Sequence, residues 1–232
     1  APVPPLVAVK APVFSMRKLD SVDALLGPEM KSTGEVMGVA ATLADALEKA
    51  CVASFGQLPD GGGALISIAD ADKAELLPVA ASLAELGFTL YATAGTATAL
   101  LGAGVSAERV AKLHGGSPSV VDVIRDQRVE LVINTISRTV TDETSGDDEA
   151  AARRPVRDGY RIRQAAVQAG IPCLTSIDTA AALVAALARR AEGEPVRVAT
   201  VGEYRQPGGP VPALAAAALL GAGATGGSRP VP

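Results

Sequence analysis

Short apolar runs of strand length alternate with Ala-rich helical segments through the middle of the chain. The strands are expected at residues 64–69, 88–92, 109–113, 130–135 and 171–176. The helices are expected at residues 72–86, 96–102, 119–126, 155–169 and 178–190. Buried, β-branched runs that alternate with helices are typical of a parallel sheet covered on both faces. The pattern therefore predicts an α/β fold with a doubly wound, mainly parallel five-stranded sheet of the Rossmann-like kind.

Polar and small residues predict where these helices begin and end. Asp72 and Asp178 stand where the first and last helices start, and an Asp in that position accepts hydrogen bonds from free backbone amides. Gly87 is expected to end the first helix. Pro78 is unfavourable inside a helix, which favours a later start for that first helix.

Composition changes divide the chain into four parts. Residues 1–56 hold two β-like runs, a stretch rich in Gly, Pro, Ser and Thr, and an Ala-rich helical segment, expected at 6–10, 12–16, 27–38 and 42–53. Residues 57–63 contain three consecutive glycines and are expected to form a linker. Residues 64–191 carry the alternating pattern, and residues 192–232, rich in Pro, Gly and Ala, are expected to form a flexible tail.

Charge and residue usage exclude several classes of protein. The 232 residues carry a net charge of −4, which argues against a sequence-independent nucleic-acid binder. Aromatic residues make up 3% and Trp is absent, so stacking platforms for single strands are not expected. The longest apolar stretch, residues 213–224, is shorter than the roughly 20 residues that cross a bilayer. We therefore expect neither a nucleic-acid partner nor a membrane partner.

Cysteine and histidine usage indicates the compartment and the metal content. Cys51 and Cys173 are far apart and form no CxxC pair, which fits a reducing cytoplasm. The single histidine, His114, has no partners at the spacing of a zinc site. The chain is therefore expected to be cytoplasmic and to hold no metal.

The sharpest local feature is the string YATAGTAT at residues 91–98, where a strand gives way to a helix. Ligands of open α/β sheets lie beyond the carboxyl ends of the strands. Gly95 allows close approach of backbone to a ligand, and Thr93, Thr96 and Thr98 supply hydroxyl donors beside the free amides of the helix start. The string predicts a phosphate site; the alternative is an ordinary strand–helix turn with a threonine cap.

Further polar residues end other strands of the predicted sheet. Lys73 follows the first strand, Lys112 lies at the end of the third, and Asn134 and Thr135 end the fourth. Carboxyl ends of parallel strands meet at one edge, so these side chains are expected to converge on the phosphate site. The alternative is that both lysines are solvated surface charges.

The string GPEMKSTGEVMG at residues 27–38, which follows Leu25 and Leu26, resembles a segment of a known protein family. It is similar to the segment that closes the carbamoyl-phosphate-forming half of the carbamoyl-phosphate synthetase large subunit, and VKAPVF at 9–14 resembles the strands upstream. The strings ADADK, ATAGTA and VINT and the segment 154–166 resemble the C-terminal allosteric domain of that subunit, which has the methylglyoxal-synthase-like fold.

The resemblance implies a C-terminal fragment of that subunit, with the end of the ATP-grasp half at residues 1–56 and the allosteric domain at 64–191. The intact enzyme makes carbamoyl phosphate from glutamine, bicarbonate and ATP with Mg or Mn, for pyrimidine and arginine synthesis. The implied partners are a nucleoside monophosphate effector of the UMP or IMP type, the rest of the large subunit and the glutaminase small subunit. The fragment alone is expected to be non-catalytic and to carry no cofactor. The residues implied at the effector phosphate are Lys73, Thr93, Thr96, Lys112, Asn134 and Thr135, with Ser67 as a weaker match.

Two other functions stay open. The same fold hosts methylglyoxal synthases, which are lyases that act on dihydroxyacetone phosphate. Their aspartate-bearing Gly-Gly motif corresponds here to GGSPSVVD, where Asp122 falls inside a predicted helix, and His114 has no nameable partner. The second alternative is a structural docking module without an effector site, which Ile136 and Arg138 favour because the family often has a hydroxyl residue and a glycine there.

Overall fold

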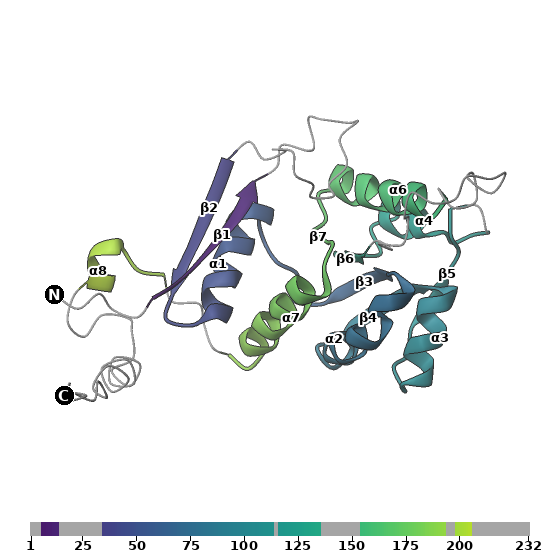
Figure 1. The fold of residues 1–232 in the computed structure, drawn as a ribbon, viewed down its shortest axis with the longest axis horizontal. Coiled ribbons are helices and arrows are strands. Elements are labelled where there is room, and N and C mark those ends of the chain that lie inside the picture. The colour runs from purple at the N-terminus through teal and green to yellow at the C-terminus, as the bar shows by residue number, and fades with distance from the viewer. Residues whose placement is uncertain (1–5, 14–33, 114–115, 136–153, 194–197, 206–232) are drawn as a thin grey trace, which may run out of the picture.

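A five-stranded parallel sheet forms the centre of the larger unit (Figure 1), which confirms the predicted doubly wound α/β fold. The structure, a computed structural model, describes residues 6–13, 34–113, 116–135, 154–193 and 198–205. The strand order is β5-β4-β3-β6-β7. The strands are β3 (Gly62–Ser67), β4 (Phe88–Thr93), β5 (Glu108–Val110), β6 (Leu131–Asn134) and β7 (Cys173–Leu174).

Helices cover both faces of this sheet because its central strands bury side chains on both sides. In β3, Ala64 and Ile66 lie in the core packed against α2 and α7, whereas Leu65 lies in a second core packed against α4 and α6. Figure 1 shows α4 and α6 on one side of the sheet and α2, α3 and α7 on the other. The helices are α2 (Lys73–Glu85), α3 (Ala94–Gly102), α4 (Val120–Arg125), α6 (Arg154–Ala169) and α7 (Ile177–Ala191).

A smaller N-terminal unit consists of an antiparallel pair, β1 (Val7–Val13) and β2 (Gly34–Ala40), with α1 (Leu43–Phe55) packed against it. Gly38 of β2 allows this packing, because a side chain there would collide with the Ala46 carbonyl of α1. The structure has one continuous strand where the sequence predicts two runs, and residues 14–33, including most of the GPEMKSTGEVMG string, lie outside the described residues.

The N-terminal unit packs on α7 of the larger unit. Cys51 of α1 belongs to the same hydrophobic core as Leu183 of α7. Arg189 pairs with Asp45 at 3.0 Å, which joins the end of α7 to the start of α1. The two units therefore share one apolar interior as well as ion pairs at its margin.

The segment between the two units differs from the predicted linker at residues 57–63. Leu58 is 1% exposed and lies in the shared core. Gly62 and Gly63 belong to β3, and a side chain at Gly63 would collide with the Arg128 carbonyl. Gly63 serves a close approach of backbone to backbone, a side chain at Gly62 would collide with the Glu130 carboxylate, and neither glycine is a linker residue.

The helix starts also differ from the sequence predictions. Asp72 ends a 3-10 turn, Asp70–Asp72, and its side chain caps nothing, while α2 begins at Lys73 and accommodates Pro78. Ser176 caps α7 in place of Asp178, since its Oγ accepts from the Thr179 amide at 3.2 Å. Helix α3 begins at Ala94, two residues earlier than predicted.

Part of the predicted flexible tail is helical. Helix α8 (Val201–Arg205) carries Tyr204, which is 7% exposed. Its hydroxyl donates to the Val39 carbonyl at 3.2 Å and accepts from Lys49 Nζ at 2.8 Å, so this turn is attached to the N-terminal unit. Residues 206–232 lie outside the described residues. Among the described helices none is both long enough and apolar enough to cross a membrane.

Candidate functional site

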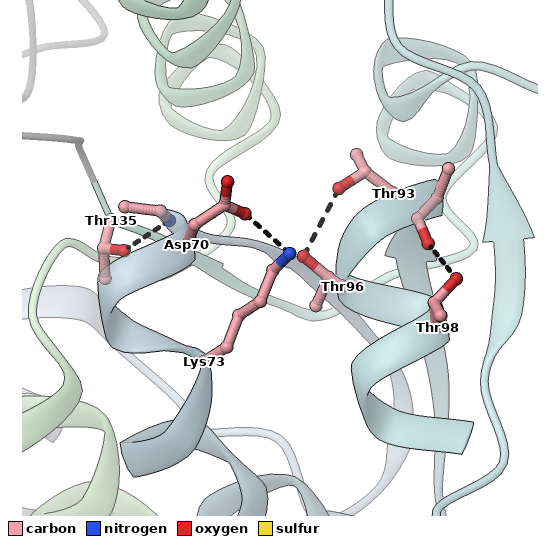
Figure 2. Close-up of polar contacts among 8 residues, drawn as sticks. Asp70, Lys73, Thr93, Thr96, Thr98 and Thr135 are labelled. Carbon is pink, nitrogen blue, oxygen red and sulfur yellow. Dashed lines mark hydrogen bonds and ion pairs between the residues drawn. The ribbon is translucent and has the colours of Figure 1, made fainter. Parts of the chain in front are cut away.

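The ammonium group of Lys73 lies against the first turn of α3. Lys73 follows β3 and Gly95 follows β4, and these strands are neighbours in the sheet. A Cβ built on Gly95 would lie 3.1 Å from Lys73 Nζ, so the missing side chain leaves the room that the ammonium uses. Figure 2 shows the Lys73 side chain extending from α2 toward this turn, where Nζ pairs with Asp70 Oδ1 at 2.6 Å.

Three threonines stand at this turn, and two of them face each other. Thr93 and Thr96 are 5% and 1% exposed, and Thr93 Oγ1 donates to Thr96 Oγ1 at 3.4 Å (Figure 2). The Thr93 side chain does not cap α3, and the first turn of this helix contains no acidic residue. The free backbone amides of this turn therefore lie beside the two hydroxyls. Thr98 Oγ1 donates back to the Ala94 carbonyl at 3.0 Å, so its hydroxyl is engaged with the backbone of α3.

The end of β6 is tied to the loop that follows β3. Thr135 Oγ1 accepts from the Ala69 amide at 3.1 Å. Asn134 Nδ2 donates to the Ser67 carbonyl at 2.8 Å. Both side chains are buried, at 9% and 3% exposure, and they fix the carboxyl ends of β3 and β6 side by side.

Lys112 stands farther out along the same edge, after β5, and its side chain is exposed. The hydrogen bond and charge of Lys73 hold the pKa of Asp70 below its usual range, and the charge of Lys112 adds a smaller effect in the same direction. Lys112 therefore lies within electrostatic reach of Asp70. The structure thus brings the predicted residues to one edge, with Lys112 as an outlying cation; their role in binding stays a prediction.

Sequence reasoning missed a buried arginine beneath this edge. Arg163 of α6 is 0% exposed, and its Nη1 donates to Asn134 Oδ1 at 2.8 Å. One turn earlier, a Cβ on Gly159 would lie 2.8 Å from Arg163 Nη1 and 3.3 Å from Asn134 Oδ1. The available signal was a lone glycine inside a helical pattern, four residues before an arginine and therefore on the same helix face.

Asp122, the carboxylate weighed as a catalytic base from the sequence, is engaged within its own helix start. Asp122 Oδ2 accepts from the Ser119 amide at 2.8 Å in a capping box at the start of α4, and this hydrogen bond lowers the pKa of Asp122. His114 lies outside the described residues, as do residues 136–153 and the side chains of Arg154 and Arg157. In the described segments no group of three or more His, Cys, Asp or Glu side chains could hold a metal ion.

A groove of about 480 Å³ lies alongside β7, the outer strand of the sheet, between the two units. Its walls come from β1 and α1 on one side and from the end of α6 and β7 on the other. Both cysteines line it, although the sequence gives no reason to bring them together. Burial raises the pKa of Cys51 to about 11, and the charge of Glu48 adds to this rise.

Together the sheet, its strand order and the polar edge at the carboxyl ends of β3, β4 and β6 define a doubly wound α/β domain with a candidate anion site. The family described as MGS-like domain matches residues 75–175, so the chain contains an MGS-like domain. The matched segment runs from α2 to just beyond β7 and includes Thr93, Gly95, Thr96, Lys112, Asn134 and Thr135.

The solved structures that are similar to this chain include the following two. Methylglyoxal synthase from Elizabethkingia anophelis NUHP1 is 21% identical, with a TM-score of 0.38, over 53% of this chain and 76% of that protein. ForH is 22% identical, with a TM-score of 0.38, over 57% of this chain and 92% of that protein. At these values the likenesses say nothing about the activity of this chain.

Proposed function

We propose that this chain is a regulatory domain that binds the phosphate of a nucleoside monophosphate at the carboxyl ends of β3, β4 and β6. The observation that carries the proposal is the position of Lys73 Nζ against Gly95, beside the buried hydroxyls of Thr93 and Thr96. A cation, hydroxyl donors and the free amides of a helix start are the groups that bind phosphate. Asn134 and Thr135 complete this edge. Lys112 supplies a second cation, which lies within electrostatic reach of Asp70.

The wider proposal is that the chain is the C-terminal part of a carbamoyl-phosphate synthetase large subunit, with UMP or IMP as its effector. The strings at residues 9–14 and 27–38 support it from the sequence. Its partners would then be the rest of the large subunit and the glutaminase subunit, and the ATP-dependent chemistry would belong to the upstream halves.

The second candidate is a lyase that converts dihydroxyacetone phosphate to methylglyoxal. The match to the MGS-like domain favours it as much as it favours the regulatory function. Such a reaction needs a base within hydrogen-bond reach of the substrate carbon. Asp122 is held in a capping box and Asp70 is paired with Lys73, so neither carboxylate is available as that base without a rearrangement.

Calorimetric titration with UMP, IMP and inorganic phosphate tests the regulatory proposal. Lys73→Met should weaken binding about ten- to a hundredfold, because a charge-assisted hydrogen bond contributes about 1.5–3 kcal/mol. Lys10→Met is the matched control, since Lys10 pairs with Glu35 on the exposed face of the N-terminal unit. Absence of binding by all three ligands would favour the docking module.

A dihydroxyacetone phosphate assay on the same samples tests the lyase. Methylglyoxal formed above background and abolished by Asp122→Asn or His114→Ala would replace the regulatory function with the lyase.

A further inference from the structure

Arg163 places a guanidinium inside the protein, directly behind the candidate phosphate edge. Its side chain is 0% exposed, and it reaches from α6 to the end of β6. An arginine is rarely buried completely, because its charge must leave water and its donors must all find acceptors. A residue in such a position is expected to serve specific contacts, and one of them is with Asn134.

The Asn134 side chain is held by groups of opposite hydrogen-bonding character. Arg163 Nη1 can only donate, and it lies 2.8 Å from Asn134 Oδ1. The Ser67 carbonyl can only accept, and it lies 2.8 Å from Asn134 Nδ2. Since a flipped amide would oppose donor to donor and acceptor to acceptor, these two contacts allow one orientation of the Asn134 amide.

Gly159 leaves the space that this contact needs. A Cβ at position 159 would press on both Arg163 Nη1 and Asn134 Oδ1. The glycine stands inside α6, where it weakens the helix relative to alanine. Gly159 therefore lowers the stability of α6 but makes room for the contact between the Arg163 guanidinium and the Asn134 amide.

We propose that Arg163 is a positioning residue that fixes the Asn134 amide with its nitrogen turned toward the carboxyl ends of β3 and β6. In this orientation the second hydrogen of Nδ2 is a donor for a phosphate oxygen, whereas the flipped amide would present a carbonyl oxygen that repels an anion. The inference rests on the proposed phosphate site. It adds that the site depends on a residue of α6 that does not itself touch the ligand.

Titration with inorganic phosphate and UMP compares three single variants. Arg163→Met should weaken binding about tenfold, and Arg163→Lys, which keeps the charge and a donor, should recover part of that loss. Arg161→Met is the matched control, since Arg161 lies on the same helix with an exposed side chain. Thermal melting identifies any variant that fails to fold, and Arg163→Lys then carries the test.

A double-mutant cycle separates positioning from a general effect on the fold. If Arg163 acts through Asn134, Asn134→Ala should weaken binding strongly in the wild-type background. In the Arg163→Met background, Asn134→Ala should weaken binding by less than a further factor of about two. If the loss of affinity in the double variant equals the product of the losses in the two single variants, the inference is overturned.

The side-chain amide signals of Asn134 in a ¹⁵N-labelled chain give a readout without ligand. Arg163→Met should shift these signals and speed their hydrogen exchange, and Arg161→Met should leave both unchanged. Unchanged signals in Arg163→Met would overturn the positioning role. A wild-type chain that binds neither phosphate nor UMP would overturn the proposed function, and the amide signals would still decide by themselves whether Arg163 holds Asn134.

Discussion

Lys73 Nζ lies where a Cβ of Gly95 would approach to 3.1 Å, so a cation from the start of α2 occupies space left by a glycine in the first turn of α3. The two residues follow β3 and β4, which are adjacent and parallel. Gly95→Ala should displace the ammonium by a few tenths of an ångström and weaken phosphate binding by about 1 kcal/mol. The free energy of unfolding should change by less than about 1 kcal/mol, because the flexible lysine yields and alanine favours the helix.

Calorimetry and urea denaturation measure these two quantities on the same samples. Gly102→Ala is the matched control, because nothing lies within 4 Å of a Cβ at the end of the same helix. Equal phosphate affinity of the two alanine variants would contradict the place of Lys73 in the site.

Asp70 competes with an incoming anion for Lys73. Its side chain is 93% exposed and pairs with Lys73 Nζ at 2.6 Å. Asp70→Asn removes this carboxylate, so phosphate should bind more tightly, about two- to fivefold at low salt, while stability should stay within roughly 0.5 kcal/mol of wild type. Isothermal titration at 20 and 300 mM NaCl checks the prediction, and the gain should shrink at the higher salt. Weaker binding by Asp70→Asn would show instead that the carboxylate orients the lysine for the ligand.

The order of strands and helices could be predicted from the sequence because each buried strand is a short apolar run with a helical segment after it. The polar edge could be predicted for the same reason, since parallel strands place Lys73, Thr93 and Asn134 at one end of the sheet. Arg163 could not, because its contact with Asn134 joins α6 to β6 across a segment whose sequence is loop-like. Local pattern describes how one element buries its own face, and it does not describe which side chain of another element reaches that face.

The sequence predictions of the helix cap at Asp72 and of a linker between the two units were wrong. Asp72 has the right chemistry for a cap, but a 3-10 turn before α2 takes its side chain away from the free amides. The glycine run at the start of β3 has the composition of a linker, yet Gly63 is needed where backbone meets the Arg128 carbonyl. A local turn decided the conformation at Asp72, and a contact between distant segments decided it at Gly63.

Glu48 of α1 should make stability depend on pH. It is 6% exposed, and burial raises its pKa, while the nearby Arg190 guanidinium opposes that rise. A carboxyl whose pKa is raised on folding contributes fully below its unfolded pKa and loses that contribution as pH rises through the folded value. The free energy of unfolding of Glu48→Gln, relative to that of wild type, should therefore increase as the pH is raised from 4 to 8.

Urea denaturation at several pH values in this range measures the difference. Glu35→Gln is the control, since Glu35 is exposed and paired with Lys10 on β1. A constant offset between Glu48→Gln and wild type across the range would contradict the raised pKa.

Cys51 should react slowly with thiol reagents in the folded chain. Its pKa of about 11 leaves little thiolate at pH 7.5, and its side chain is buried in the core shared by the two units. Iodoacetamide should modify it at least tenfold more slowly in buffer than in 8 M urea, as followed by peptide mass spectrometry in a Cys173→Ser background. Equal rates in the two conditions would show that α1 leaves the core readily.

The attachment of α1 to β2 depends on Gly38, where a side chain would collide with the Ala46 carbonyl. Gly38→Ala should therefore separate the strand pair from the helix and cost about 1–3 kcal/mol of local stability. Hydrogen exchange should speed up at the amides of residues 34–55 and stay unchanged in α2 and β4, because those elements belong to the larger unit. Gly34→Ala on the same strand meets nothing within 4 Å and should leave the exchange pattern as it is. Phosphate binding should survive Gly38→Ala, since no residue of the candidate site lies in the N-terminal unit. A parallel loss of phosphate binding would mean that the two units act as one, and that the site depends on how α1 sits against α7.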